Sequence, residues 1–320
     1  MFLTKRKVIL AKVETAEGTD AVPTVADIID CRNSKMEQES SLQKKDTHRP
    51  SISDEGGVVT DIKGKCSFEV DMKGSGTVGT RSQLGKLLLA CGFEERLETD
   101  ENEAVTGLVY LPVSSQGLMK TVTIYEYYLG DGNSSGVLKK LIGAKGSITF
   151  KMEAGKVATA QFNFEGRYVE PTDATNPTVT SESFEQTIPK IVENAECTYD
   201  DVAYVSRGVT VNVNNDLYSI PDVNSAQGVL KTLITARNVS GTFAPDMINV
   251  SVKNFFAAWK NNSKANLSLK VGSVAGNIIE VSMHMIQFEK VNDADDSGFA
   301  YQEIPFIATG EDSELKFIFR

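Results

Sequence analysis

Apolar and polar residues alternate along residues 59–72 of the chain. Cys66, Phe68 and Val70 share one side of this stretch, while Glu69 and Asp71 lie on the other. Strict alternation is typical of a strand with one buried and one wetted face, as in antiparallel sheets. We therefore expect a strand here, in a mainly β fold.

Two short amphipathic helices are predicted, over residues 81–91 and 252–260. Each has apolar residues at positions i, i+3, i+4 and i+7, which form a stripe on one helix face. The first stripe is Leu84, Leu87, Leu88 and Cys91, and the second, 168 residues further on, is Val252, Phe255, Phe256 and Trp259.

The residues upstream of the two helices also match, now at a separation of 175 residues. Phe68, Asp71 and Met72 recur as Phe243, Asp246 and Met247, and Arg32 recurs as Arg207. One shorter loop in the second copy accounts for the difference of 7. We expect two tandem antiparallel β-sandwich or barrel units, each with one covering α-helix and a long β-hairpin. The predicted boundaries are an N-terminal arm at 1–27, unit 1 at 28–169, a linker or arm at 170–190 and unit 2 at 191–320.

A long polar stretch at residues 37–58 precedes the first strand. It is longer than a compact domain needs, and such loops are usually functional or disordered. We expect an extended hairpin loop that mediates assembly, with a shorter tip at 220–228 in unit 2; the N-terminal arm and the 170–189 segment are weaker candidates. The candidate contact residues in the first hairpin are Glu39, Lys44, Lys45, Asp46, Arg49, Asp54 and Glu55.

Composition excludes several classes of protein. The net charge of −10 argues against tight nucleic-acid binding, which needs a basic surface. No apolar run approaches the ~20 residues of a membrane helix, and the apolar stretch at 8–11 is too short for a signal peptide. The four cysteines are scattered, so we expect reduced thiols and folding in the cytosol.

Two motifs resemble ligand sites, and both have simpler interpretations. Residues 74–79 read G-x-G-x-x-G, but the preceding strand alternates, whereas a dinucleotide-binding strand is apolar on both faces. Residues 293–298 resemble half of a calcium loop, but Ile304 stands where the bidentate Glu belongs. A flexible connection and a hairpin turn are favoured. His48 and His284 lack nearby partners, so no catalytic, cofactor or metal residue is assigned.

Several runs of structural residues together resemble the tail tube (major tail) proteins of long-tailed bacteriophages with non-contractile tails. The resemblance covers nearly the whole chain. It lies in Lys-Arg-Lys-Val-Ile-Leu-Ala-Lys-Val-Glu at 5–14, Gly-Thr-Asp at 18–20, Val-Pro-Thr at 22–24, Gly-Ser-Gly-Thr-Val-Gly-Thr at 74–80, Leu-Leu-Leu-Ala-Cys-Gly-Phe at 87–93, Leu-Ile-Gly-Ala-Lys-Gly-Ser at 141–147 and Gly-Arg-Tyr-Val-Glu-Pro-Thr-Asp at 166–173.

The resemblance implies a structural virion protein and not an enzyme. Such proteins stack as rings into a hollow tube around a tape-measure protein, meet tail terminator and tail-tip proteins, and later conduct double-stranded DNA without binding it tightly. Neighbouring sheets join into a barrel that lines the lumen, which pairs every exposed strand edge. The tail would be assembled in the host cytoplasm.

The lumen is expected to be lined by polar faces of strands 61–71 and 236–246. An alternative is that these faces point outward to bulk water, because alternation identifies the wet face only. The candidate lumen residues are Lys63, Lys65, Glu69, Asp71, Asn238, Ser240 and Thr242.

The duplication bears on ring symmetry. Related tube proteins with one such unit form six-membered rings, so a chain with two units predicts a trimer of pseudo-sixfold shape. A hexamer with the second unit outside remains open. Two other classes also remain: a secreted or surface β-sandwich module, such as an adhesin or carbohydrate-binding module, and an enzyme using the glycine loop.

Overall fold

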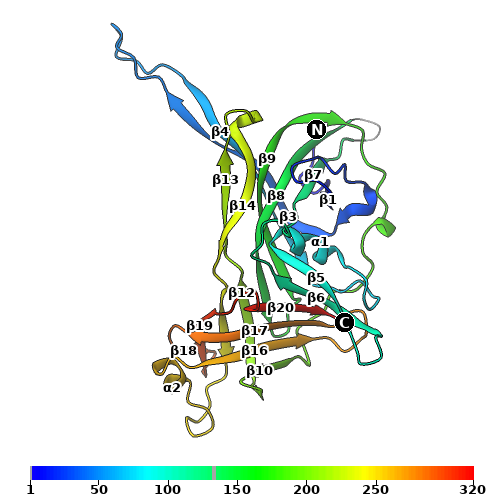
Figure 1. Cartoon of the computed structure of the whole chain (residues 1–320), viewed down its shortest axis with the longest axis vertical. Helices are drawn as coiled ribbons and strands as arrows, with labels where there is room; N and C mark the ends of the chain where they lie inside the picture. Colours follow the sequence, from blue (N-terminus) through cyan, green and yellow to red (C-terminus); the bar gives the residue numbers. More distant parts are fainter. Residues whose placement is uncertain (1, 132–134) are drawn as a thin grey trace.

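The N-terminal half of the chain is built on one antiparallel sheet. The computed structural model describes residues 2–131 and 135–320, and its first sheet runs in the order β2-β1-β7-β8-β9-β4-β3 (Figure 1). The strands are β1 (Lys7–Val13), β2 (Ile28–Ile29), β3 (Cys31–Lys44), β4 (Gly57–Asp71), β7 (Val122–Tyr128), β8 (Gly136–Glu153) and β9 (Thr159–Ala174).

The C-terminal half repeats part of this arrangement. Its strands β12, β15, β19 and β18 pair in that order, and β17 pairs with β16, β19 and β20. A separate hairpin, β13–β14, extends away from β12 and β15 (Figure 1). The strands are β10 (Glu196–Tyr199), β11 (Val202–Ala203), β12 (Ser206–Asn212), β13 (Asn215–Pro221), β14 (Val229–Arg237), β15 (Ser240–Pro245), β16 (Lys264–Val271), β17 (Ile279–Phe288), β18 (Asn292–Asp296), β19 (Phe299–Ala308) and β20 (Leu315–Phe319).

Two strand pairs join the halves. The end of β8 pairs with β12, where Thr149 lies opposite Asn212. β20 pairs with β6 (Val105–Pro112), which in turn pairs with β5 (Phe93–Thr99). The fold is therefore mainly β and antiparallel, as expected, and its two halves share one hydrogen-bonded sheet.

The alternation predicted for residues 59–72 is confirmed in β4. Cys66, Phe68 and Val70 are buried, whereas Glu69 and Asp71 remain partly exposed. Phe68 packs against Phe162 and Phe164 of β9, with ring centroids 5.8 Å apart in each pair. The apolar face of the sheet thus forms the core, and burial of such aromatic side chains contributes about 1.5–3 kcal/mol each.

The two predicted helices exist but differ in burial. Helix α1 (Gln83–Ala90) buries its whole stripe and is followed by Gly92, whose positive φ of 82° ends it. Helix α2 (Phe255–Lys260) is shorter, and only Phe255 of its stripe is buried. Val252 precedes the helix and is 70% exposed, so the helix starts three residues later than predicted and its apolar stripe is largely open. Three short 3₁₀ helices are η1 (Val25–Asp27), η2 (Ser181–Ser183) and η3 (Ala226–Gly228). Among the described residues, no helix has the length and apolar character that crossing a membrane requires.

The polar stretch at 37–58 forms a hairpin whose two ends, 37–44 and 57–58, are strand. β3 and β4 pair as far as Lys44 opposite Gly57, leaving only 45–56 as the turn. The paired part beyond residue 40 projects from the body as a long arm, here called the β3–β4 arm (Figure 1). Its backbone groups bond within the hairpin, which is why a polar sequence can hold an extended strand there.

Two segments outside the expected units are integrated into the fold. Residues 7–13, assigned to an N-terminal arm, form β1, because their apolar side chains Val8 and Ile9 are buried against the sheet. Residues 170–174 continue β9, and the rest of the expected linker is held by side chains. Lys73 Nζ donates to Glu185 O at 2.9 Å and Asn277 Nδ2 donates to Ile188 O at 3.0 Å.

The glycine-rich segment at 74–79 is a packed connection between β4 and α1. Gly76 N donates to Gly276 O, and Gly74 N donates to the side chain of Asn277 at 2.8 Å. A Cβ on Gly74 would lie 2.1 Å from Gly276 O, so glycine is required for this close approach. The segment is occupied by the second half of the chain, which explains the glycines without a nucleotide.

Candidate assembly surfaces

The two halves contribute to one polar face of the joined sheet. Residues directly opposite each other on paired strands point to the same side of a sheet. Two rows of such neighbours cross five strands. The first row is Glu69, Gln161, Thr149, Asn212 and Ser240, and the second is Asp71, Thr159, Lys151, Thr210 and Thr242.

Four of the candidate lumen residues therefore lie on one face: Glu69, Asp71, Ser240 and Thr242. Lys65 lies further along the same side of β4. Lys63 lies one step further toward the arm on that side, and its Nζ meets Oε1 of Glu165, the residue opposite Lys65, at 3.1 Å. Asn238 is exposed between β14 and β15.

Paired charges of both signs cover this polar face. Arg32 contacts Glu69 at 2.9 Å and Asp71 at 2.7 Å, and its hydrogen bond lowers the pKa of the Glu69 carboxyl. In the second half Arg207 lies 3.5 Å from Asp246 and 2.5 Å from Asp296. The sequence matches of Arg32 with Arg207 and of Asp71 with Asp246 thus correspond to the same ion pair in both halves.

The candidate contact residues of the β3–β4 arm are exposed, except that Glu55 is half-buried. Several pair with each other: Lys44 with Asp54 at 3.0 Å, and Arg49 with Glu55. Glu39, at the base, contacts Lys65 at 2.7 Å. Lys45 and Asp46 lie exposed in the turn. The structure brings these residues together on one hairpin, which is mostly exposed along its length among the described residues.

The duplication extends to the hydrogen-bond register of the strands. Lys35 lies opposite Ser67 in the first half. The residues 175 positions further on, Thr210 and Thr242, lie opposite each other in the second half. The next strand matches as well. Phe68 faces Phe162 on β9, and its counterpart Phe243 faces Ile304 on β19.

This correspondence makes β18 the counterpart of the end of β8. Gln161 of β9 faces Thr149, and its counterpart Glu303 of β19 faces Asn292. The four strands β3-β4-β9-β8 thus correspond to β12-β15-β19-β18. Reading the sequence alone missed β18, because five residues of the type Asn-Asp-Ala-Asp-Asp carry no strand pattern.

The outer edges of this eight-strand row have only one partner each among the described residues. β3 pairs with β4 alone, and β18 pairs with β19 alone. Their counterparts, β12 and β8, pair with each other. The carbonyls of Ser34 and Met36 on the β3 edge accept bonds from the side chains of Lys7 and Lys139 at 3.1 and 3.0 Å. The β18 edge therefore offers backbone groups to a further strand, and on the β3 edge a further strand would replace these two lysine contacts.

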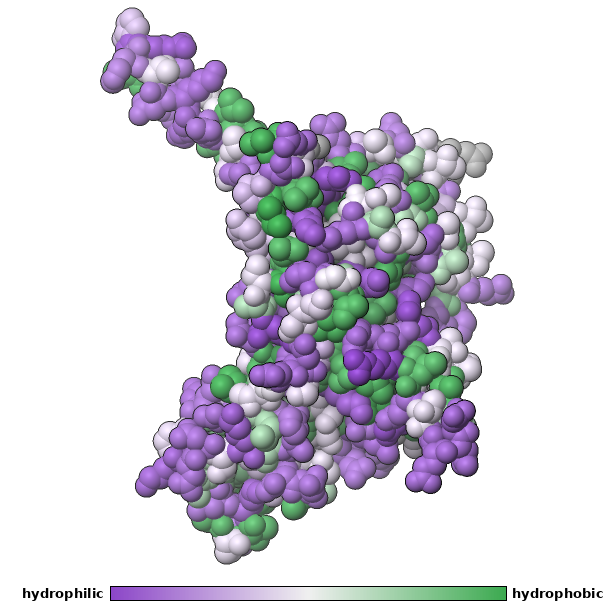
Figure 2. Space-filling model, in the orientation of Figure 1, coloured by the Kyte–Doolittle hydropathy of each residue, from purple (hydrophilic) through white to green (hydrophobic). Residues whose placement is uncertain are grey.

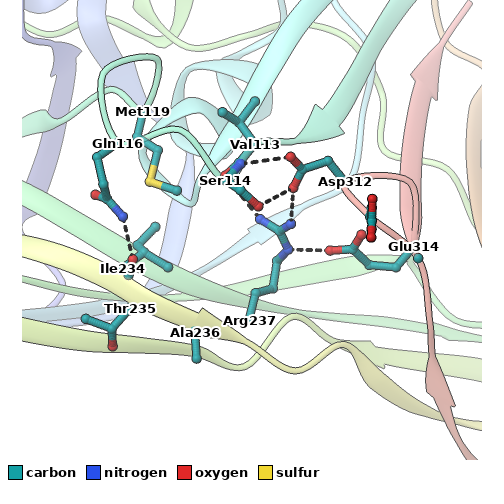
Figure 3. Close-up of a pocket in the computed structure, with 12 residues that line it drawn as sticks. Val113, Ser114, Gln116, Met119, Ile234, Thr235, Ala236, Arg237, Asp312 and Glu314 are labelled. Carbon is teal, nitrogen blue, oxygen red and sulfur yellow. Dashed lines mark hydrogen bonds and ion pairs between the residues drawn. The ribbon is translucent and has the colours of Figure 1, made fainter.

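A cleft of about 540 Å³ lies between the base of β14 and two loops (Figure 3). Arg237 in its wall donates to Glu314 Oε1 at 2.5 Å and to Asp312 Oδ1 at 2.8 Å, and Ser114 Oγ donates to Asp312 at 2.6 Å. Although burial opposes it, hydrogen bonds from Ser114 and Arg237 lower the pKa of Asp312. These bonds tie β14 to the two loops, so the cleft is a structural junction between the two halves, although Glu314 Oε2 is buried without a hydrogen-bond partner among the described residues.

The remaining candidate groups do not form a reactive site. His48 and His284 are exposed on separate elements, and all four cysteines are free thiols. Burial raises the pKa of Cys31 to about 12 and that of Cys197 to about 11, which keeps both thiols protonated. Over residues 2–131 and 135–320, no group of three or more His, Cys, Asp or Glu side chains is placed to hold a metal ion. Residues 293–298 form the β18–β19 hairpin turn.

Comparison with known proteins agrees with a structural role. No curated protein sequence matches the chain. The family model of the phage tail tube protein matches residues 4–315, nearly the whole chain. This protein belongs to the phage tail tube protein family.

Proposed function

We propose that this protein stacks as rings into the hollow tail tube of a long-tailed phage with a non-contractile tail, through which the genome is delivered. One observation carries the proposal. Both halves of the chain supply four corresponding strands to one sheet, and the two open edges of that sheet correspond to the strands that already pair inside the chain.

A ring can close if the pairing of β8 with β12, which joins the two halves within one chain, is repeated between chains. β18 of one chain would pair with β3 of the next as β8 pairs with β12. Within the chain, Glu153 lies opposite Gly208 and Thr149 lies opposite Asn212. Replacing each residue by its counterpart puts Asp296 of one chain opposite Asn33 of the next, and Asn292 opposite Glu37. Such a head-to-tail contact closes into a ring when the rotation fits.

Three chains would form the ring, with pseudo-sixfold shape. Eight strands from each give a 24-stranded lining, about 48 Å across between backbones at a ~4.8 Å strand spacing and ~40° tilt. This leaves room for a DNA duplex. The pairing of β8 with β12 supports the trimer over a hexamer with an outer second unit, because both halves would then belong to one continuous wall.

The polar face containing Glu69, Asp71, Ser240 and Thr242 would line the lumen. Glu69 and Asp71 are paired with Arg32, and the net charge of −10 disfavours adhesion of a polyanion, so DNA slides past. In the assembled tail the partners would be the tape-measure protein, the tail terminator and tail-tip proteins. The charged tip of the β3–β4 arm would contact the neighbouring ring.

Electron microscopy of the purified protein tests the function and the symmetry together. We expect rings or tubes whose averaged end-on views show three bilobed subunits. Six identical subunits per ring would refute the trimer. A protein that stays as dispersed monomers over the full concentration range would contradict self-assembly and favour a surface-binding module.

A cysteine at position 69 tests the lumen assignment. Glu69→Cys should react with a bulky maleimide in free subunits and be strongly protected in tubes sealed at both ends. Asn102→Cys, in the loop between β5 and β6, serves as the exposed control and should react equally in both states. Equal reactivity at position 69 before and after assembly would place this face outside the tube.

A further inference from the structure

The β13–β14 hairpin seals the end of helix α1 inside the chain. Asn215 Nδ2 donates to the carbonyls of Cys91 and Gly146, both at 2.8 Å. Ile234 of the hairpin packs over Gly92 and is only 4% exposed. The end of α1 is therefore dry because a hairpin from the other half of the chain covers it.

The β3–β4 arm is the counterpart of that hairpin, residue for residue. Leu42 faces Val59 in the arm, and Leu217 faces Ile234 in the hairpin, 175 residues further on. The pair of Gln43 and Val58 corresponds in the same way to Tyr218 and Leu233. In the arm, however, the corresponding side chains are not covered by other described parts of the chain. Leu42 is 58% exposed and Val59 is 53% exposed.

The end of helix α2 is exposed, whereas the corresponding end of α1 is covered. Phe256 and Trp259 are 42% and 43% exposed, whereas their counterparts Leu88 and Cys91 in α1 are fully buried. Figure 2 shows apolar surface where the arm leaves the body, while the arm's tip is mostly hydrophilic. Two apolar surfaces thus lie open on one chain: the base of the β3–β4 arm and the end of α2. The arm corresponds to the β13–β14 hairpin and the end of α2 to the end of α1, and those two counterparts are in contact within the chain.

The register of the proposed ring brings these two surfaces together. The Trp259 Nε1–H donates to Glu289 O at 2.8 Å, and Glu289 is the counterpart of Gly146. The end of α2 therefore sits beside the start of β18 as the end of α1 sits beside β8. If Glu37 lies opposite Asn292, continuing the antiparallel register places Ser40 opposite Glu289. The arm then leaves the sheet next to Trp259 of the neighbouring chain.

We propose that the base of the β3–β4 arm of one chain covers the exposed end of α2 on the next chain in the ring, with Val59 against Trp259 and Lys260. The occupant of the apolar surface on α2 is thus a second copy of this chain. This inference rests on the proposed self-assembly but goes beyond it, because rings could close through strand edges while the arm reached elsewhere. The base of the arm would then bind the neighbouring chain within the same ring, in addition to the contact that its tip makes with the next ring.

Trp259 is the single tryptophan of the chain, so its fluorescence reports directly on this surface. On assembly of the unmodified protein, its emission should shift to the blue and acrylamide quenching should fall roughly two-fold, because contact removes the indole from water. Val59→Asp should weaken both changes in any rings that still form. Val223→Asp, on the exposed tip of the other hairpin, is the matched control and should leave both changes intact.

Crosslinking identifies the partner of α2. In a Val59→Cys and Lys260→Cys double variant, a short bismaleimide should link assembled subunits into dimers and trimers on a denaturing gel. Position 59 is on the arm part of β4 and position 260 ends α2, and these two elements lie at opposite ends of the molecule, so a link must join two chains (Figure 1). Ile52→Cys with Lys260→Cys, at the arm tip, should not link. Tubes that form with unchanged Trp259 fluorescence and without the 59–260 link would overturn this inference and leave the tube function standing. Failure of the unmodified protein to assemble would count against the proposed function itself.

Discussion

Replacing Asp293 by proline should abolish ring and tube formation while leaving a folded monomer. Within the chain, Ala154 N donates to Arg207 O and Val213 N donates to Ile148 O, so even-numbered residues of β8 turn their backbone groups toward β12. The counterparts of Phe150 and Met152 in β18 are Asp293 and Asp295. Their N–H groups face the open edge. Proline removes the donor at 293 and places its ring where the next strand should lie.

The fold should tolerate this change. Proline is accommodated on an edge strand when its missing N–H faces solvent, so we expect a loss of less than about 1 kcal/mol in the free energy of unfolding. Asp293→Ala is the matched control, because it also removes the carboxylate that accepts from Gln302 at 3.3 Å but keeps the N–H. Sedimentation and electron microscopy should show monomers for the proline variant and tubes for the alanine variant. Tubes from both would show that β18 does not form the joint between chains.

Excising the β3–β4 arm should also prevent tube formation without unfolding the protein. Ser41 lies opposite Thr60, so residues 41–60 can be replaced by Asn-Gly, which favours a two-residue hairpin turn. Most of the removed side chains are exposed, and the removed strands pair only with each other. We expect a change of about 1 kcal/mol or less in the free energy of unfolding. Deleting 38–53 instead would leave part of β4 without its partner strand and is a poorer test.

A smaller excision separates the two roles of the arm. Replacing only the turn at 45–56 by a short turn keeps Leu42 and Val59 and removes the charged tip. Single rings that no longer stack are expected, because the base would still clasp the neighbour in the ring. Electron microscopy distinguishes stacked tubes from single rings. Normal tubes from the full excision would contradict any assembly role for the arm.

Much of the candidate surface could be predicted because it depends on local alternation. Glu69, Asp71, Ser240 and Thr242 occupy polar positions of alternating strands, and each alternating strand has one wet face. Lys63 continues the same alternation in β4, whereas Asn238 lies in the turn before β15 and outside the paired strands. The alternation ends where β4 changes direction into the arm: Asp61 has a positive φ of 53°, and no sequence pattern marks that turn.

The second helix shows the limit of reasoning from periodicity. Its stripe has the same spacing as that of α1, yet the stripe is buried in one half and largely open in the other. Spacing identifies which side chains share a face, but what covers that face depends on elements distant in the chain. The helix α1 packs on β1, β5 and β8, and the β13–β14 hairpin, more than 100 residues away, covers its end at Cys91 and Gly92.

The sequence by itself determined that the chain is mainly β, that the same order of strands and helix occurs twice, and which face of β4 is wet. These properties follow from side-chain periodicity, which is local. Only the tertiary structure decided that β8 pairs with β12, that β18 corresponds to β8, and that the β3 edge and the end of α2 lie open. Strand pairing depends on backbone N–H and C=O groups that nearly every residue carries alike, so the pairing partner is selected by the packing of the whole chain and not by local sequence.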